Sequence, residues 1–178
     1  MTKALPLVSV IIPAHNEAVC IAKAIESALF QKTTFGIELI IVDDGSKDDT
    51  LIIAKRYQDN FSNLRVITNK TCLGKGESVR SAYNSAKGKY IHILDADDLF
   101  TNWEKLQYQV DLLEQDDELF AVSHNTLCIS EDGTVHLTPK IVVDKTFDYL
   151  ECCAFTFYCH TSSCLFRRIE DGLPAYFS

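Results

Sequence analysis

Short apolar runs rich in β-branched side chains alternate with segments of helical spacing in the first hundred residues. The apolar runs occupy residues 7–13, 37–42, 64–68 and 90–94. Strands that alternate with helices form parallel sheets covered by helices on both faces, because each connection crosses over the sheet in the right-handed sense. The pattern therefore predicts an α/β fold whose continuous apolar strands are buried on both faces.

The segments between these runs indicate where the helices begin and end. Asn16 is a favoured N-cap residue and is expected to cap a helix that continues through Gln31. A second helix is expected from Asp48 to about Asn60, because negative charge is favoured at a helix N-terminus. A third is expected over residues 76–86.

The remainder of the chain is less regular. Residues 103–116 fit an amphipathic helix, and the Asp-Gly pair at 132–133 predicts a hairpin between residues 120–129 and 134–143. Residues 155–166 predict a strand pair or a strand that follows a loop. The apolar face expected for the helix consists of Trp103, Leu106, Val110 and Leu113.

Charge and length exclude several classes of protein. The 178 residues include 17 Lys and Arg and 25 Asp and Glu, so the formal net charge is −8, which excludes a basic nucleic-acid-binding protein. No apolar stretch approaches the ~20 residues of a membrane-spanning helix. The N-terminal residues also lack the apolar segment of about 7 to 15 residues that a secretory signal requires. The seven irregularly spaced cysteines indicate reduced thiols. We expect one cytosolic domain over residues 1–178.

Polar clusters follow three of the four predicted strands, at residues 13–17, 43–46 and 95–98. Parallel sheets bind ligands at the carboxyl ends of their strands, so these clusters are expected to meet at one edge. Asp95 and Asp97 offer the hard oxygen ligands that a divalent cation prefers. Because the chain is acidic overall, a bound nucleotide diphosphate needs local cancellation of charge. Mg²⁺ or Mn²⁺ is the predicted cofactor.

The sequence resembles the inverting nucleotide-sugar glycosyltransferases of family two, which have the GT-A fold. The resemblance implies a Rossmann-like, mostly parallel sheet with helices on both faces and a smaller mixed β part toward the C-terminus. It divides the single domain into a nucleotide-binding half, 1–98, and a partial acceptor-side half, 99–178. Four fragments carry it: V-S-V-I-I-P-A-H-N-E at 8–17, I-I-V-D-D-G-S at 40–46, N-K-T-C-L-G-K-G-E-S-V-R at 69–80, and A-K-G-K-Y-I-H-I-L-D-A-D-D at 86–98.

The resemblance also implies a function. Members transfer a sugar from a nucleotide-diphosphate sugar, with a UDP-sugar favoured here, to a hydroxyl of a glycan or lipid-linked acceptor. The expected setting is bacterial surface polysaccharide or glycoconjugate synthesis in the cytosol, with contact to the inner face of the membrane left open. No nucleic acid is an expected partner, and the oligomeric state is open.

Site residues of the nucleoside pocket are implied position by position. Pro13 and Glu17 match pocket positions, and Glu17 would accept a ribose hydroxyl. Asp44 matches the residue that binds the base edge, whereas Asp43 is expected to be a structural turn residue. His15 stands where relatives have an aromatic ring; an imidazole can stack on a base but can also become charged near neutral pH.

The diphosphate end of the site is implied in the same way. Asp95, Ala96 and Asp97 match the DxD motif, with Asp97 as a direct metal ligand and Asp95 shared between ribose and metal. Asp98 is expected to cap the helix that begins near Trp103. Two cations of the 69–80 segment would meet phosphate or base, or are surface charges: Lys75 and Arg80.

A catalytic base is less evident. In relatives the carboxylate base follows the segment that residues 161–168 resemble, and here only Glu170 and Asp171 follow it. The expectation is that the chain is a truncated or natural fragment carrying the donor site. The alternative is a nucleotide-sugar-binding or assembly module that lacks the base.

Three other hypotheses about function or metal binding lack the sequence features that they require. A nucleotidyltransferase would need a glycine-rich loop after the first strand, and a dehydrogenase would need G-x-G-x-x-G, of which residues 74–76 supply only part. A zinc site lacks the paired C-x2-C spacing of structural zinc. Its ligands would come from Cys152, Cys153, Cys159, His160 and Cys164.

Overall fold

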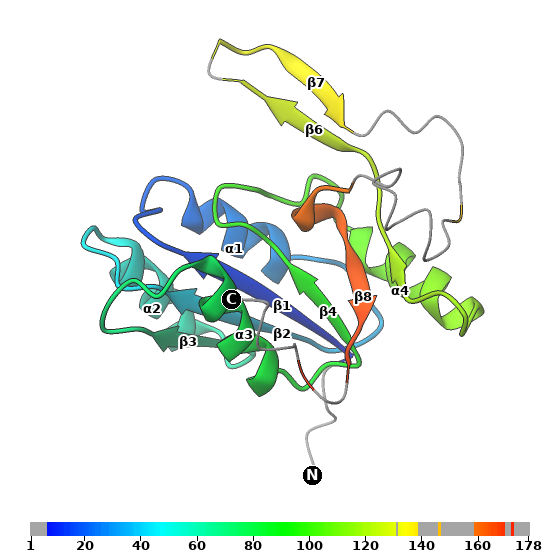
Figure 1. The fold of residues 1–178 in the computed structure, drawn as a ribbon, viewed down its shortest axis with the longest axis horizontal. Coiled ribbons are helices and arrows are strands. Elements are labelled where there is room, and N and C mark those ends of the chain that lie inside the picture. The colour runs from blue at the N-terminus through cyan, green and yellow to red at the C-terminus, as the bar shows by residue number, and fades with distance from the viewer. Residues whose placement is uncertain (1–6, 131, 139–145, 147–158, 170–171, 173–178) are drawn as a thin grey trace.

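The computed structural model describes residues 7–130, 132–138, 146, 159–169 and 172, which form a six-stranded sheet with helices on both faces and a separate hairpin (Figure 1). The strands are β1 (Val8–Ala14), β2 (Ile37–Asp43), β3 (Leu64–Thr68), β4 (Tyr90–Ile93), β5 (Ala121–Val122), β6 (Thr126–Ile129), β7 (Val135–Thr138) and β8 (Leu165–Arg167). The helices are α1 (Ile21–Leu29), α2 (Thr50–Asn60), α3 (Lys75–Ser85), α4 (Lys105–Gln115) and the 3-10 turn η1 (Thr161–Ser163).

The strand order of the main sheet is β3-β2-β1-β4-β8-β5. The first four strands in this order are parallel, whereas β8 is antiparallel to both β4 and β5. Strands β2 and β3 lie on one side of β1, and β4, the next strand in the chain, lies on the other side. The carboxyl ends of β1 and β4 therefore border a topological switch point, where open α/β sheets bind ligands.

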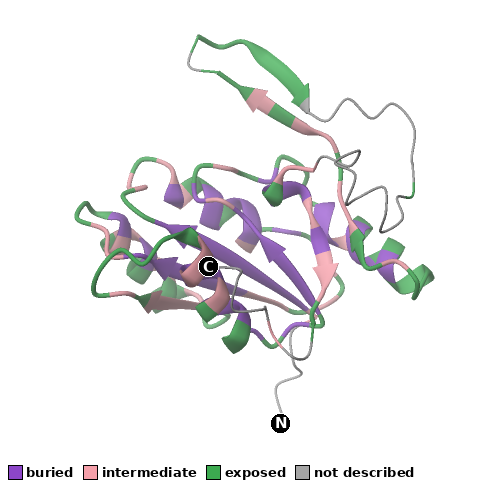
Figure 2. Cartoon of the chain, viewed as in Figure 1, coloured by how far each residue is buried: buried purple, intermediate pink, exposed green. Residues whose placement is uncertain are grey.

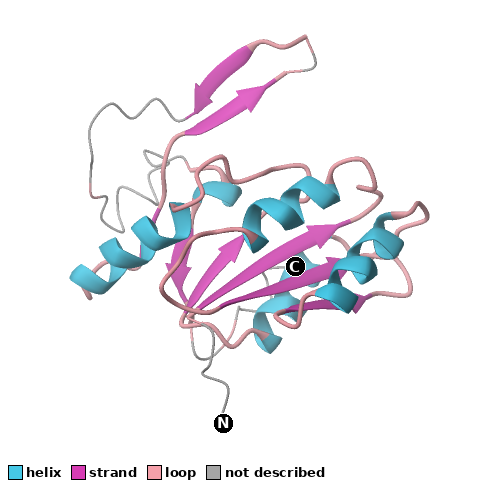
Figure 3. Ribbon diagram, turned by 180° about the vertical axis from the view of Figure 1, so that it is seen from behind, coloured by secondary structure: helices cyan, strands magenta, loops and turns pink. Residues whose placement is uncertain are grey.

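Two apolar layers enclose this sheet because successive strand side chains point to opposite faces. Val10 and Ile12 of β1 pack in the layer that contains α1, α2 and α4, whereas Ile11 packs on the side of α3. All three side chains are fully buried, and Figure 2 shows the central strands as the most buried part of the molecule. Figure 3 shows α1, α2 and α4 together in front of the sheet. The predicted α/β fold is thus confirmed.

Two local predictions are wrong. Asn16 does not cap α1, which begins at Ile21 after Cys20; Asn16 has a positive φ of 59°, and its side chain accepts a hydrogen bond from the backbone N–H of Lys47. Trp103 does not belong to the buried face of α4, because the helix begins at Lys105 and the Trp103 side chain is exposed. The other three residues predicted for that face are buried: Leu106, Val110 and Leu113.

The predicted hairpin is present as β6 and β7, with Gly133 in the turn at a φ of 82°. It projects from the main sheet (Figures 1 and 3). A strand after a loop is also present as β8, although residues 139–143 and 155–158 of these two predictions lie outside the described residues. None of the described helices has both the length and the apolar character that crossing a membrane requires.

Candidate functional site

A cleft of about 310 Å³ opens at the carboxyl ends of β1, β2 and β4. Its volume lies at the lower end of the range of about 300–1,000 Å³ that is typical of small-molecule sites. The cleft brings together eight of the nine residues that the sequence suggested for nucleotide and metal binding. These eight are Pro13, His15, Glu17, Asp44, Lys75, Asp95, Ala96 and Asp97.

Arg80 is the ninth residue and is not part of the cleft lining. Its guanidinium group donates two hydrogen bonds, of 2.8 and 2.6 Å, to the Glu77 carboxylate one turn earlier on α3. This pairing lowers the pKa of Glu77 and raises that of Arg80. The Arg80 guanidinium group is thus paired with Glu77 on α3, outside the cleft lining.

The loop after β1 forms one wall of the cleft. His15 Nδ1 lies 2.7 Å from the Asp44 carbonyl oxygen, and Asn16 Nδ2 lies 3.0 Å from His15 Nε2. Because a carbonyl only accepts hydrogen bonds and an amide NH₂ only donates them, Nδ1 carries the proton and Nε2 accepts. The imidazole ring is therefore held at the rim of the cleft by both of its nitrogens.

Glu17 follows on the same wall, where its backbone N–H donates a 2.7 Å hydrogen bond to Thr50 Oγ1 at the start of α2. Burial, together with the negative charges of Asp97 and Asp48, raises the pKa of Glu17 above its ordinary value. The effect of Asp97 arises because Glu17 and Asp97, from the loops after β1 and β4, both line the cleft. The cleft therefore favours a cationic or hydroxyl-donating occupant near Glu17.

Asp44, directly after β2, is the most extensively hydrogen-bonded acid of the cleft. Only 3% of its surface is exposed. Its carboxylate accepts hydrogen bonds from the backbone N–H groups of Leu73 and Gly74 at 2.9 and 2.8 Å, from Asn69 Nδ2 at 2.7 Å and from Cys72 Sγ at 3.2 Å. Burial by itself would raise the pKa of Asp44, but these donors lower it to about 2. Asp44 is therefore an anion that holds the loop before α3 in place.

Gly45 explains how closely the loop of residues 69–74 approaches the end of β2. It has a φ of 69°, a conformation that residues with a Cβ rarely adopt, and a Cβ built on it would lie 2.8 Å from the carbonyl carbon of Thr71. The Asp-Gly sequence at the end of β2 thus permits the tight packing through which Cys72 and Gly74 enter the cleft lining. The sequence did not single out these two residues, because their contribution depends on contact with a distant strand end.

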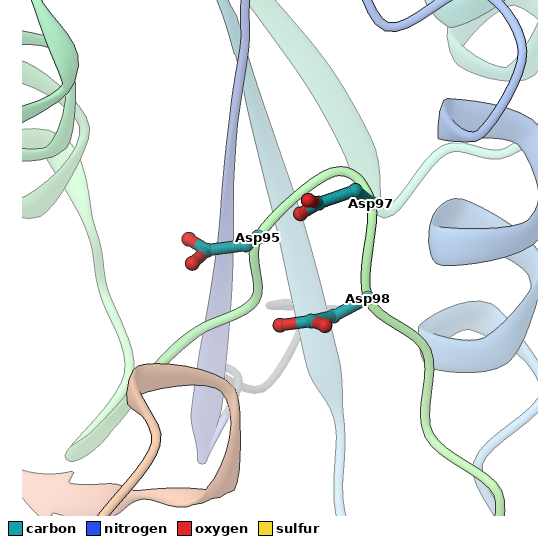
Figure 4. Close-up of side chains that lie close together, drawn as sticks. All are labelled: Asp95, Asp97 and Asp98. Atoms are coloured by element: carbon teal, nitrogen blue, oxygen red, sulfur yellow. The ribbon is translucent and has the colours of Figure 1, made fainter. Parts of the chain in front are cut away.

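Two aspartates, Asp95 and Asp97, complete the cleft lining, and Asp98 lies next to them. Asp95, Asp97 and Asp98 lie on the loop that follows β4 (Figure 4), and carboxylate oxygens from all three come within 4.8 Å of one another. Lys75 Nζ is 2.7 Å from each oxygen of the Asp95 carboxylate. Three carboxylates with one lysine leave excess negative charge, and oxygen donors in this number suit Mg²⁺ or Mn²⁺. The donor set therefore fits a divalent cation.

Asp98 is held differently from its neighbours. Ser162 Oγ donates a hydrogen bond to Asp98 Oδ2, and His160 Nδ1 lies 3.4 Å from the same oxygen. The prediction that Asp98 caps the following helix is wrong, because Glu104 occupies the N-cap position of α4. Asp98 meets Ser162 because β8, the strand after Ser162, pairs with β4, the strand before Asp98.

Comparison with known proteins gives the family. The profile described as glycosyl transferase family 2 matches residues 9–172, which is most of the chain. The chain belongs to glycosyltransferase family 2. The resemblance of the four fragments is thereby confirmed, and the GT-A expectation agrees with solved glycosyltransferase structures of the same fold.

Family 2 relatives with known names include two proteins of Escherichia coli. The chain is 36% identical to chondroitin synthase over 133 residues, which are 75% of this chain and 19% of that protein. It is 39% identical over 118 residues, 66% of this chain and 45% of the other, to the protein named UDP-Glc:alpha-D-GlcNAc-diphosphoundecaprenol beta-1,3-glucosyltransferase WfaP. The chain therefore spans less than half the length of either relative.

A solved structural neighbour of this chain contains both GDP-Man and Mn²⁺. The mannosyltransferase PcManGT from Pyrobaculum calidifontis, in complex with GDP-Man and Mn²⁺, matches with a TM-score of 0.60 and 28% identity. The match covers 68% of this chain and 36% of that one.

Two sequence hypotheses fall partly or wholly beyond the described residues. Glu170 and Asp171, the candidate bases, lie outside them. So do Cys152 and Cys153 of the zinc hypothesis, whereas Cys159 and Cys164 are present as free thiols. In the part of the chain that the structure describes, the three aspartates are the one group of three or more acidic, His or Cys side chains close enough to share a metal ion.

Proposed function

We propose that this chain carries the donor site of a metal-dependent, inverting glycosyltransferase that uses a nucleotide-diphosphate sugar. The observation that carries the proposal is that one cleft is lined by Asp44 and by Asp95 and Asp97, which form an acidic cluster with the neighbouring Asp98. A nucleotide sugar needs both features, because its base donates hydrogen bonds to an acceptor and its diphosphate needs cations.

Asp44 supports a base with an N–H on its edge. An aspartate with a pKa of about 2 is ionised at neutral pH and only accepts hydrogen bonds. Uracil and guanine present such an N–H, and we favour a UDP-sugar. The name of WfaP supports this choice with UDP-Glc, whereas PcManGT was solved with GDP-Man, so both bases belong in the test.

The part of the cleft lined by Asp95 and Asp97 suits the leaving diphosphate. In the proposed complex Asp97, together with Asp95, holds Mg²⁺ or Mn²⁺, and the bound cation supplies charge stabilisation for the departing nucleoside diphosphate. Lys75 carries a second positive charge at the same place and would contact a phosphate oxygen. Glu17 and Pro13 would position the ribose, and His15 at the rim would lie against the base.

Transfer itself requires an acceptor hydroxyl and a base. We propose a glycan or lipid-linked acceptor at the inner face of a membrane in bacterial glycoconjugate synthesis, in line with the diphosphoundecaprenol acceptor in the name of WfaP. Direct displacement at the anomeric carbon by that hydroxyl would invert the configuration. A carboxylate must take the hydroxyl proton, and Glu170 or Asp171 remains the candidate for this role.

Calorimetric titration with UDP and GDP, each with and without Mn²⁺, tests donor binding. The proposal predicts binding that requires Mn²⁺ and favours UDP; absence of binding, or equal binding in excess EDTA, would contradict it. Release of UDP from a UDP-sugar in the presence of a diphosphate-linked glycan acceptor then separates an enzyme from a module that only binds. Metal-dependent binding without any release would favour the module.

A further inference from the structure

Ser162 joins the two ends of the acidic loop after β4. Its Oγ accepts a 3.0 Å hydrogen bond from the backbone N–H of Asp95 and donates its own hydrogen to Asp98 Oδ2. The backbone N–H of Asp98 in turn donates to the Asp95 carbonyl oxygen at 3.0 Å. One buried hydroxyl group therefore closes the turn that contains Asp97.

The sheet fixes this contact. β8 pairs with β4 in an antiparallel register that places Leu165 opposite His92 and Phe166 opposite Ile91. Just before β8, the turn η1 brings the Ser162 side chain to the backbone N–H of Asp95, which follows β4. The turn η1 is itself held, because the Ser163 hydroxyl group donates a 2.7 Å hydrogen bond to the His160 carbonyl oxygen. Ser162 thus lies in a hydrogen-bonded turn that directly precedes a strand paired with β4.

The three carboxylates consequently have different surroundings. Asp98 Oδ2 is occupied by the Ser162 hydroxyl group, whereas Asp97 is exposed, and no hydrogen bond or ion pair joins it to another described residue. A buried donor fixes one carboxylate as an anchor and leaves the exposed one available. The geometry indicates a division of labour within the cluster.

We infer that Ser162 is a positioning residue for the cation site, which sets the geometry of the Asp95–Asp98 turn and makes Asp98 its anchor while Asp97 binds the ion. The inference rests on the proposed function, because it concerns the same cation. It also means that a segment more than sixty residues away in sequence, in the acceptor-side half of the chain, controls how tightly the donor's cation is held.

Electron paramagnetic resonance of Mn²⁺, titrated with protein alone, measures the affinity without nucleotide or turnover. Loss of an outer-shell partner typically costs about 10- to 100-fold in metal affinity, so Ser162→Ala is expected to raise the Mn²⁺ dissociation constant about tenfold. Ser162→Thr retains the hydroxyl group and is expected to restore most of the affinity. Thr161→Ala, at the exposed neighbouring position, is the matched control and should bind like the wild type.

A second pair of variants tests the anchor without removing Ser162. Asp98→Asn keeps a carbonyl oxygen that accepts the Ser162 hydrogen bond but removes one negative charge near the cation, so its Mn²⁺ affinity should fall by less than that of Asp97→Asn. Asp97→Asn removes a proposed direct ligand and should weaken Mn²⁺ by about 100-fold or more. Amide hydrogen exchange provides the structural readout: the Asp95 N–H should exchange faster in Ser162→Ala and remain protected in Thr161→Ala.

The outcomes separate this inference from the proposed function. Wild-type protein that binds Mn²⁺, combined with a folded Ser162→Ala variant of equal affinity, would overturn the positioning role alone. Equal losses in Asp98→Asn and Asp97→Asn would also overturn it, because Asp98 would then be a ligand. Wild-type protein that binds no Mn²⁺ would remove the metal-dependent function first, and the positioning role with it.

Discussion

Lys75 Nζ lies 2.7 Å from both carboxylate oxygens of Asp95, so an ammonium group from the start of α3 meets the acidic loop after β4. The lysine side chain is 56% exposed, whereas that of Asp95 is 19% exposed. The ammonium group therefore occupies the face of Asp95 that a divalent cation would approach. Cation binding at Asp95 would release Lys75 to a phosphate oxygen.

Lys75→Gln tests this exchange of partners. Because the variant removes a competing positive charge, Mn²⁺ alone should bind up to about fivefold more tightly, in keeping with about 1 kcal/mol for an exposed ion pair. Binding of UDP in the presence of Mn²⁺ should weaken, since the phosphate loses a charged donor. Titration calorimetry measures both constants, with Lys55→Gln on α2 as the control, and changes in the same direction would contradict the exchange.

Asp44→Asn tests the acid stability that the loop donors produce. A carboxylate whose pKa is lowered to about 2 stabilises the folded state above its ordinary pKa of 3.8, and this stabilisation disappears as the pH falls from about 4 to 2. At one pKa unit per about 1.4 kcal/mol, the variant should lose about 2 kcal/mol of unfolding free energy at pH 7. Urea unfolding should show the difference shrinking toward zero near pH 2; a difference independent of pH would refute this account.

Gly45→Ala tests the close approach of the 69–74 loop to the end of β2. The substitution imposes a Cβ at a φ of 69° and 2.8 Å from Thr71, so it should cost more than about 1 kcal/mol and displace the loop. Nucleotide affinity should fall as well, because Cys72 and Gly74 of that loop line the cleft. Gly133→Ala is the control, since it shares a positive φ but has open space around it. Equal nucleotide affinity in the two variants would argue against the loop's role.

Lys105→Met tests how the buried lysine at the start of α4 makes stability depend on pH. The Lys105 ammonium group lies 4.1 Å from the centre of the Phe100 ring and contacts His92 Nε2 and Gln109 Oε1, and burial lowers its pKa to about 7. Because the unfolded chain then binds more protons between pH 7 and about 10, the unfolding free energy should rise over that range by a few kcal/mol. The variant should lack this rise and be more stable at pH 7. Chemical unfolding at pH 7 and 9.5 measures the effect, and an identical slope in both proteins would count against it.

Much of this fold was predictable because its strands are continuous apolar runs with clear ends. The prediction for β3 matches Leu64–Thr68, and β2 extends the predicted run by the single residue Asp43. The meeting of Asp44 and Asp97 in one cleft followed from parallel strands, whose carboxyl ends share an edge. Side-chain alternation within a buried strand and the position of its end are local properties, so sequence reports them.

Two of the failed predictions share a physical cause. Asn16 and Asp98 were expected to cap the helices next to them, yet each binds a residue far along the chain, Lys47 and Ser162. Short polar side chains satisfy whichever donor or acceptor the tertiary structure presents, so local helix propensity does not decide their partner. Ser162 itself was missed because it acts on residues 64 and 67 positions earlier, and no local spacing signals such a contact.

The central claim is that Asp97 in this cleft binds the cation of a nucleotide diphosphate. Thermal unfolding with Mn²⁺ and saturating UDP tests it most directly in three proteins: the wild type, Asp97→Asn and the surface control Asp59→Asn. Ligand at 100 times its dissociation constant adds about 2.7 kcal/mol, so the wild type and Asp59→Asn should gain roughly 5 °C or more. Asp97→Asn should gain almost nothing; a full shift in that variant would contradict the account.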